Sequence, residues 1–590
     1  MIGMKKERKV KFEPVFFICL FLVCLFLSWP LNFPDGKPKG GTEIFADKAM
    51  YYVYLPATFI YHWDVKKFPE KIDERTRGFT LHIKNDKLII KATYGVALML
   101  TPFFIPVHLI AKVFDLQPDG FSEFYQKMMT IPGMVYLILG LFFLQRFLYR
   151  YLPKNVTYFT VFFLFVGTNL FFYSVDEGLM SHVYSFSLLS AALFLLKKFL
   201  DNGKKSFSLF ILLSLVLSIA ALIRPTNLVL LSLFAFLDVT TFKEIRERMI
   251  FFIRPKYSLT FLLILFVLFI PQMIYWNYLS GSFLYNSYPN EGFTNLKHPM
   301  LLPLWFAPLN GFFLYTPMAI FFTAGIILMI MRKLPNGVFF GFLFLFISVV
   351  FASWHCWFFA GSLGMRPFVD FYAIFALPFG YFSLWIFKRR NLLFRSLFIL
   401  FVIVFSWYNL LLTWHYNFFP GSVWSWDDYR IYISDAGFQK YYKNTYTYKN
   451  DFENNTLSDN IPRIKYPVHS RTLSTCLDEN MEFSCKYSKQ FDQIISGIPR
   501  QAVASVWIMP EKQVKTGALF VCSIEDINHK NIFYHGISLD RFIKKNGEWT
   551  KAEEILHFPE WIPPSSIVSF YIWNPARTKF YADDITLEFK

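Results

Sequence analysis

Residues 14–29 read PVFFICLFLVCLFLSW, an apolar run without a charged side chain that follows the basic segment Lys5–Lys11. A helix needs about 20 mostly apolar residues to cross the hydrocarbon core of a membrane. A signal peptide has the same order of segments, but no small-x-small cleavage site stands near Leu27–Pro34 and further apolar runs follow. We therefore predict an uncleaved first membrane helix, with the N-terminus in the cytoplasm.

The composition of the whole chain agrees with a membrane protein. Of its 590 residues, 55% are hydrophobic, 21% aromatic and only 17% charged, whereas soluble proteins carry roughly a quarter charged residues. The net charge of +17 is spread over short segments between apolar runs, where it sets the orientation of the chain. This distribution argues against nucleic-acid binding.

The apolar runs predict about eleven membrane crossings. Basic clusters fall in every second loop and so predict the cytoplasmic side, while the longer loops hold most acids and Trp residues and are predicted to be exported. The first exported loop is 32–126. The predicted spans are 14–31, 127–146, 156–174, 182–199, 206–223, 226–240, 258–277, 311–331, 337–353, 369–387 and 396–414.

One further apolar stretch, residues 91–114, is not predicted to cross. It contains Pro102, Pro106 and His108, and a crossing here would put basic clusters on both sides of the membrane. We expect an interfacial or re-entrant helix on the exported face.

From about residue 415 the chain becomes polar, and its apolar runs shorten to strand length. After a Tyr- and Trp-rich connector at 415–449, segments such as 502–509, 517–524, 567–573 and 585–589 predict an exported all-β sandwich over 450–590. Cys476 and Cys485 of this domain form either a disulfide or two free thiols.

The first exported loop offers a candidate catalytic acid. Asp47 stands shortly before Tyr51 and Tyr52, which are candidate substrate-binding residues. A carboxylate here can accept a proton from an alcohol or bind a metal ion. The alternative is that Asp47 only caps an amphipathic helix that extends to about Tyr61.

A second acidic site precedes the next helix. Asp176 and Glu177 can join Asp47 in a site for a divalent ion, Mg²⁺ or Mn²⁺, or can simply be acids at the N-terminus of a helix. That helix is expected to begin near His182, which is either a substrate-binding residue or a hydrogen-bonded interface residue.

Two arginines and an aromatic loop complete the candidate site. Arg224 lies before a proline that forces a turn between two short spans, and an ionisable group at membrane depth suggests function. Arg366 offers a donor fork suited to phosphate, and Trp354, His355 and Trp357 can contact a sugar. The alternative is an interfacial aromatic belt with snorkelling arginines.

Together these positions resemble the GT-C superfamily of integral-membrane glycosyltransferases, which includes protein O-mannosyltransferases, lipid A aminoarabinose transferases and the catalytic subunits of oligosaccharyltransferases. The resemblance covers roughly residues 1–415. Its motifs are Asp47 with Tyr51 and Tyr52, the Lys91-Ala92-Thr93-Tyr94-Gly95 segment, Asp176-Glu177, Arg224-Pro225-Thr226, the GFFLYTP segment at 311–317 and the small-residue run that ends at Arg366.

The resemblance implies an enzyme that transfers a sugar from a polyprenyl phosphate to an acceptor hydroxyl on the exported face, with inversion. Asp47 would be the general base or the acid that orients the acceptor, and Lys91 matches a lysine of the family that contacts the lipid phosphate. Because the departing phosphate gains negative charge, Lys91, Arg224 or Arg366 could bind and stabilise it. The chain departs from its relatives at Ala92-Thr93, where they have Pro-Pro, and at Asp47-Lys48, where mannosyl- and aminoarabinose-transferases have Asp-Glu.

Several consequences follow for partners and location. The expected partners are the polyprenyl-phosphate sugar, membrane lipid and a glycan, lipid or protein acceptor, and the expected location is the plasma membrane with the C-terminal domain periplasmic or extracytoplasmic. That domain resembles jelly-roll carbohydrate-binding modules, in which Trp507, Trp561 and Trp573 would stack on sugars or form the core. The alternative function is a lipid-linked glycan transporter or a polymer-assembly protein without transferase chemistry.

Overall fold

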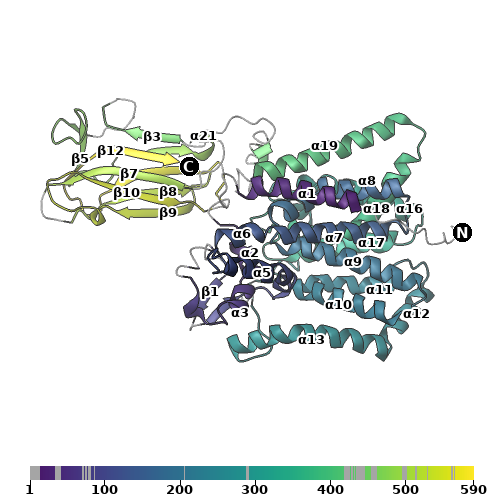
Figure 1. The fold of residues 1–590 in the computed structure, drawn as a ribbon. Coiled ribbons are helices and arrows are strands. Elements are labelled where there is room, and N and C mark those ends of the chain that lie inside the picture. Colours follow the sequence, from purple (N-terminus) through teal and green to yellow (C-terminus); the bar gives the residue numbers. More distant parts are fainter. Residues whose placement is uncertain are drawn as a thin grey trace. The chain divides into compact units, whose positions relative to one another are not determined.

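The computed structural model describes residues 14–33, 42–69, 72, 76, 81–84, 87–204, 206–287, 291–359, 361–416, 426, 429–430, 432–433, 446–453, 462–484, 486–494, 501–511, 515–527, 529–559, 562–563 and 565–589. The chain forms two compact units. The helical unit comprises Met1–Phe359 and Leu363–Thr413, and the second unit comprises Ala360–Ser362 and Trp414–Lys590 (Figure 1).

The described part of the helical unit contains seven helices long and apolar enough to cross a membrane. Six of them coincide with predicted spans. The long helices are α1 (Pro14–Asn32), α5 (Gly95–Val113), α6 (Glu123–Met128) continued by α7 (Ile131–Leu148), α9 (Ser181–Asp201), α13 (Pro255–Ser280), η6 (Arg366–Phe371) continued by α18 (Tyr372–Phe387), and α19 (Leu392–Tyr416).

The other five predicted spans are apolar helices of at most 17 residues; α17 has the predicted bounds and the other four are shorter than predicted. They are α8 (Lys154–Val166), α10 (Phe207–Ile223), η5 (Pro225–Leu231) with α11 (Ser232–Phe236), α16 (Ala319–Met331) and α17 (Gly337–Ser353). At 1.5 Å per residue, a 13-residue helix such as α8 is only about 20 Å long. Helix α8 ends before Gly167, α10 ends before Arg224-Pro225, and α16 begins shortly after Thr316-Pro317. Irregular backbone with its polar groups therefore adjoins an end of each of these helices.

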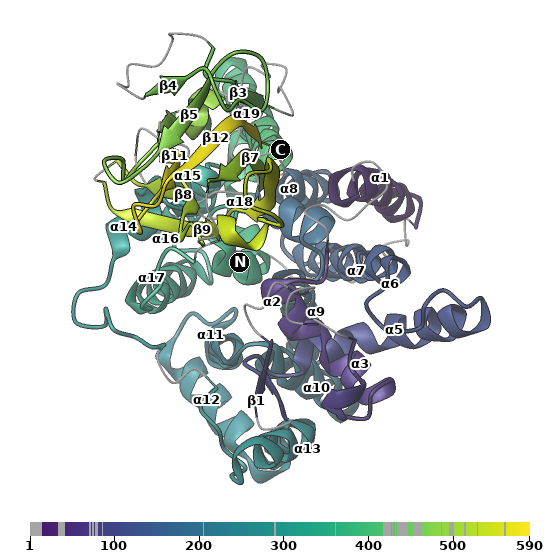
Figure 2. The same cartoon turned by 90° about the vertical axis from the view of Figure 1, so that its left-hand side faces the viewer.

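Helix α9 forms the centre of the helical unit. It packs against α7, α10, α18 and η6, and the views in Figures 1 and 2 agree on this central place. Its side chains from Ser181 to Leu193 are buried without interruption. A helix that is buried on all sides holds its neighbours in fixed positions, and the candidate site forms at its N-terminal end.

Helix α5 is the apolar stretch that was predicted not to cross. Figure 2 views α7, α9 and α10 nearly end-on, whereas α5 runs sideways in the same view. Leu109 and Val113 on one side of α5 are exposed, while Phe104 and His108 on the other are buried. An apolar helix that lies across the bundle and exposes one apolar side has the expected geometry of an interfacial helix.

The second unit is an antiparallel β-sandwich, as predicted. One sheet has the order β10-β7-β12-β5-β4 with β3 also paired to β12, and the other has the order β6-β11-β8-β9. The strands are β3 (Tyr446–Asn450), β4 (Arg463–Ile464), β5 (Ser474–Leu477), β6 (Tyr487–Gln490), β7 (Gln501–Pro510), β8 (Leu519–Glu525), β9 (Asn531–Ser538), β10 (Thr550–His557), β11 (Ile567–Trp573) and β12 (Phe580–Phe589).

The core of this sandwich forms where the two sheets face each other. Phe570 of β11 packs against Phe589 of β12 with ring centroids 5.9 Å apart, and both are buried. Of the predicted sugar-stacking tryptophans, Trp507 is covered by His469 at 3.7 Å between ring centroids. Trp573 lies beside Phe483, and Trp561 lies outside the described residues. Cys485, one of the two cysteines of the disulfide alternative, also lies outside them.

Candidate functional site

The candidate catalytic acid pairs with the candidate phosphate-binding arginine. Asp47 lies in the first turn of α2 (Ala46–Tyr52), and its Oδ2 is 3.0 Å from Nη1 of Arg366, the first residue of η6. The residue that precedes α2 is Phe45, and it makes no side-chain cap bond. The alternative in which Asp47 merely caps a helix is therefore wrong, and residues from two distant loops meet here.

A second ion pair lies behind the first. Asp370, at the end of η6, is fully buried, with its Oδ1 2.7 Å from His182 Nδ1 and its Oδ2 3.5 Å from Arg224 Nη1. Asp370 thus links the start of α9 to the turn after α10. His182 is fully buried as well, so of its two alternatives the hydrogen-bonded interface residue agrees with the structure.

Tyr51 connects the two ion pairs. It hydrogen-bonds Arg224 and lies close to Arg366. Asp47 and Tyr51 are four residues apart on α2, so they share one face of the helix. Two arginines, one partly exposed carboxylate and one phenol therefore gather at one place, as the site prediction requires.

Glu177 of the second acidic segment binds a lysine and does not join Asp47. Lys48 Nζ lies 2.6 Å from Glu43 Oε1 and 3.1 Å from Glu177 Oε2, and its side chain is only 3% exposed. Asp176, at the end of the short π-helix η4 (Phe172–Asp176), is buried beside this cluster. Helix α9 begins at Ser181 with no acid in its first turn, so the helix-terminus alternative for Asp176 and Glu177 is wrong.

Charge and burial act on this cluster in opposite directions. Burial lowers the pKa of Lys48, but the charges of Glu177 and Glu43 outweigh it and raise the pKa to about 12. Burial raises the pKa of Glu43, the charge of Lys48 lowers it and the charge of Glu177 raises it again, which leaves it at about 7. Lys48 therefore stays protonated, and the carboxylates of Glu43 and Glu177 share its single positive charge.

The candidate metal ligands do not fit a metal site. Asp47 is paired with Arg366, and Glu177 with Lys48. Within the described ranges, no three acidic, His or Cys side chains are grouped so as to hold a metal ion. Among the described residues, Asp47, Asp176 and Glu177, which the sequence offered as possible ligands for Mg²⁺ or Mn²⁺, are therefore not grouped as one metal site.

The loop before Arg366 is held by close packing. Asn169 Nδ2 donates to the Leu363 carbonyl at 2.9 Å, and Leu363 N donates to the Tyr173 hydroxyl at 3.1 Å. Gly364 has φ of +65°, and a Cβ there would lie 2.8 Å from Tyr315 Cβ. A glycine is required at this position, two residues from the guanidinium that pairs with Asp47.

We expect Gly364→Ala to lower the free energy of unfolding by about 2–5 kcal/mol, because a left-handed conformation costs roughly 1–2 kcal/mol and overpacking adds about 1–3 kcal/mol. Gly361→Ala is the matched control: Gly361 has φ of +66°, but no described atom lies within 4 Å of its Cβ position. Thermal unfolding of both variants in detergent checks the prediction. Equal melting temperatures would show that the contact with Tyr315 is unimportant.

The remaining predicted residues lie around this centre or in the core. Lys91 Nζ pairs with Glu291 Oε1 at 2.7 Å, a carboxylate of the segment between α13 (Pro255–Ser280) and α14 (Leu301–Phe306). Tyr52 is fully buried and donates to the Gly120 carbonyl at 2.5 Å. Its predicted role in substrate binding is wrong, because its hydroxyl is bound inside the fold.

The aromatic loop is joined to the segment before α14 (Leu301–Phe306). Trp354 packs edge-on against Phe293 at 5.2 Å between ring centroids, and His355 N donates to the Gly292 carbonyl at 2.8 Å. Trp354, His355 and Trp357 are all half-buried. They remain candidates for substrate contact.

Asp370, Glu43 and Lys48 were not predicted as site residues. Asp370 stands in an otherwise apolar stretch of η6 and α18, and the rule that singled out Arg224, an ionisable group at membrane depth, applies to it equally. Glu43 and Lys48 lie in a polar loop where charged residues are common, so no sequence signal distinguishes them.

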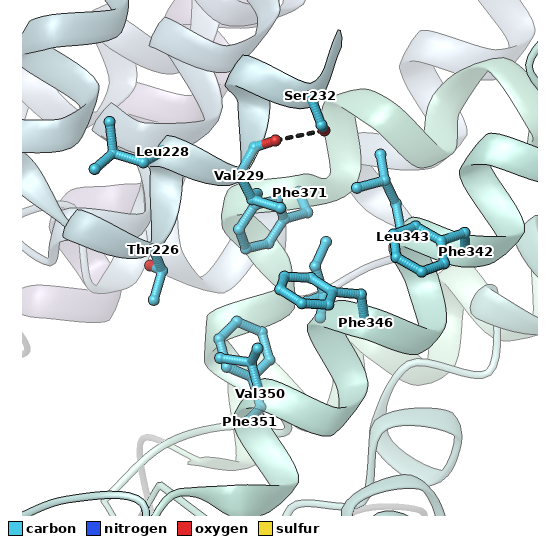
Figure 3. A pocket seen from close by; sticks show the side chains of 11 residues that line it. Thr226, Leu228, Val229, Ser232, Phe342, Leu343, Phe346, Val350, Phe351 and Phe371 are labelled. Carbon is cyan, nitrogen blue, oxygen red and sulfur yellow. Dashed lines mark hydrogen bonds between the residues drawn. The ribbon is translucent and has the colours of Figure 1, made fainter. Parts of the chain in front are cut away.

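Figure 3 shows an apolar cavity of about 420 Å³. It lies between η5 with α11 on one side and α17 on the other, and Phe346, Phe351 and Phe371 line it. Thr226, also in its lining, is two residues after Arg224, and Phe371 directly follows Asp370. The charged centre and the apolar cavity therefore share the same short segments of chain.

No protein-family model matches the sequence, and no curated protein matches it. Among solved structures, the chain is similar to the oligosaccharyltransferase AglB from Archaeoglobus fulgidus, bound to an inhibitory peptide and a dolichol-phosphate, with 12% identity and a TM-score of 0.41 over 70% of this chain and 57% of that one. The chain thus spans little more than half of AglB. It is also similar to the arabinosyltransferase EmbB from Mycobacterium smegmatis, with 9% identity and a TM-score of 0.33 over 98% of this chain and 66% of that one. Both solved neighbours are named as enzymes that transfer sugars, an oligosaccharyltransferase and an arabinosyltransferase.

Proposed function

We propose that this protein transfers a sugar from a polyprenyl-phosphate donor to an acceptor hydroxyl, on the exported side of the membrane and with inversion. The observation that carries the proposal is the Asp47–Arg366 pair, 3.0 Å apart. An apolar cavity of about 420 Å³ is lined by Thr226 and Phe371, which neighbour Arg224 and Asp370 in the sequence. A lipid-linked sugar has an apolar tail, a phosphate and a sugar in sequence. The cavity suits the apolar tail, the arginines suit the phosphate, and the carboxylate can act beside the sugar.

The arginines are suited to the phosphate of the donor. Arg366 directs Nη1 at Asp47, while its buried Nε has no hydrogen-bond partner among the described residues. A buried donor group without an acceptor costs about 1–3 kcal/mol, so a phosphate oxygen would stabilise it. Arg224, with its side chain 22% exposed, supplies a second positive charge.

The reaction balances with these groups alone. The acceptor oxygen attacks the anomeric carbon of the sugar, and the bond from that carbon to the phosphate oxygen breaks. The acceptor proton passes to the Asp47 carboxylate. The electron pair of the broken bond leaves on the polyprenyl phosphate, where Arg366 and Arg224 stabilise the added charge. Displacement from the opposite side inverts the anomeric centre.

The test is transfer by the purified full-length protein. We expect turnover with a synthetic polyprenyl-phosphate sugar and a hydroxyl acceptor, and none with the corresponding nucleotide sugar, which lacks the lipid tail. Flux of the lipid-linked sugar across proteoliposomes without any glycosidic product would contradict the transferase and support the transporter alternative.

The cavity is proposed to hold the first part of the lipid tail. We expect Val350→Trp, which fills the cavity, to lower kcat/KM for a long-chain donor roughly tenfold or more. Losing the burial of two methylene groups, at about 0.8 kcal/mol each, is enough for that effect. A donor with a very short chain should be affected much less. The control is Val338→Trp at an exposed position of the same helix, and equal effects of the two variants would exclude the cavity from donor binding.

A further inference from the structure

The acids around Lys48 have the composition of a cation site, and the ion among them is an amine. Lys48 Nζ contacts Glu43 Oε1 at 2.6 Å and Glu177 Oε2 at 3.1 Å, and the two carboxylates come from different segments of the chain. The buried carboxylate of Asp176 lies nearby. A lysine ammonium group has three donors and so can hold several carboxylates together.

The surroundings of the amine suit an ammonium ion better than a metal ion. Lys48 Nζ lies 4.5 Å from the ring centroid of Phe45, and an aromatic face attracts an organic cation. Mg²⁺ needs oxygen ligands at about 2.0–2.1 Å in nearly octahedral geometry. A phenyl ring on one side of the cluster provides no such oxygen.

The cluster is also built into the fold. Glu43 N donates to Gln126 Oε1 at 2.6 Å, and Gln126 Nε2 donates to the Phe121 carbonyl at 3.0 Å. The side chains of Lys48 and Glu43 are only 3% and 4% exposed. The amine thus joins the start of α2 to the segment that precedes α9.

We propose that the ammonium group of Lys48 takes the place of a divalent cation among Glu43, Asp176 and Glu177, and that it positions Asp47 for the reaction. Lys48 follows Asp47 in the first turn of α2, so the contact between Lys48 and Glu177 fixes the turn from which Asp47 reaches Arg366. Lys48 is a positioning residue, since it acts through the carboxylates and the helix. Its consequence for turnover rests on the proposed function.

The experiment measures binding of Mn²⁺ by electron paramagnetic resonance to the purified full-length protein, after bound metals have been removed with EDTA. We expect the wild type and Glu177→Gln to bind the same number of Mn²⁺ ions. We expect Lys48→Ala, which removes the amine and leaves its carboxylates, to bind one ion more. Lys48→Arg keeps a cation there and should bind no additional ion.

The matched control is Lys127→Ala. Lys127 also pairs with a carboxylate, Glu123, at 2.6 Å, but its side chain is 35% exposed, so its loss should not change Mn²⁺ binding. A Mn²⁺ ion that the wild type binds and Glu177→Gln loses would overturn the proposal, as would a folded Lys48→Ala that binds no additional ion. If Lys48→Ala does not fold, the number of Mn²⁺ ions bound by the wild type and by Glu177→Gln decides whether the wild-type cluster holds a metal ion.

Turnover supplies an independent measurement. EDTA should leave transfer by the wild type unchanged. The proposal would be overturned if EDTA abolished transfer and added Mn²⁺ restored it in the wild type but not in Glu177→Gln. The binding measurements need no turnover. An inactive protein would therefore contradict the proposed function while Mn²⁺ binding still decided the role of Lys48.

Discussion

Asp47→Asn is expected to lower the turnover of the sugar-transfer reaction by about 10²–10⁴-fold, the usual contribution of a general base. Asparagine has the shape of aspartate and still offers an oxygen to Arg366, so the contact at 3.0 Å can persist. It cannot take a proton from the acceptor hydroxyl. The loss should therefore fall on kcat, with little change in the KM for the donor.

The stability of this variant should hardly change. The Asp47 side chain is 33% exposed and that of Arg366 15%, and an ion pair open to solvent contributes only about 0–1 kcal/mol. Thermal unfolding in detergent separates loss of chemistry from loss of structure.

Asp64→Asn is the control from the same loop. Asp64 accepts a hydrogen bond from Lys66 N at 3.2 Å and pairs with Lys67 at 3.4 Å, so its substitution should leave turnover intact. Equal turnover by the wild type and Asp47→Asn would remove Asp47 from the mechanism and leave the Arg366 pair with a structural role only.

Much of the helical fold was predictable, because apolar runs and basic loops report directly on membrane crossing. For α5, prolines and the side of the basic clusters argue against a crossing, whereas its length and apolar composition would allow one, so its interfacial placement stays a prediction. The lengths of α8 and α16 were not predictable in the same way. Apolar residues continue past Gly167 and before Pro317, so hydropathy does not reveal where the backbone leaves the helix.

Some residues of the candidate site, such as Asp47, Arg224 and Arg366, were identified from the sequence. Asp370, Glu43 and Lys48 were not, and neither was the pairing of the charges. Asp47 and Arg366 stood out because of their residue type and predicted side of the membrane. Sequence distance gives no indication that Asp47 pairs with Arg366 while Glu177 pairs with Lys48. Those contacts depend on how α2 and the segment before α9 pack together. The sequence therefore left open whether Asp47 and Glu177 share a metal site, and in the structure the two acids pair with different cations.

Asp370→Ala is expected to cost about 3–5 kcal/mol of stability, the usual effect of removing one partner from a buried ion pair. Asp370 is 1% exposed and faces both Arg224 and His182. Without it, the Arg224 charge loses its buried counterion and the His182 ring loses its partner at 2.7 Å. Thermal unfolding in detergent should show a large decrease in melting temperature.

The matched control is Asp201→Ala. Asp201 also has two cationic partners, Lys197 at 2.8 Å and Arg150 at 3.7 Å, but its side chain is 33% exposed. Its loss should cost at most about 1 kcal/mol. Similar decreases in melting temperature for the two variants would show that the burial of Asp370 is not what makes it important.

A double variant separates stability from function at this position. In Arg224→Met with Asp370→Leu, both charges are gone, and replacing a buried ion pair with apolar residues is often neutral or stabilising. We expect this variant to recover much of the stability that Asp370→Ala loses and yet to transfer sugar poorly, because the Arg224 charge is absent when the phosphate departs. Recovery of turnover together with stability would mean that Arg224 serves only to neutralise Asp370, and Arg366 alone would then bind the donor phosphate.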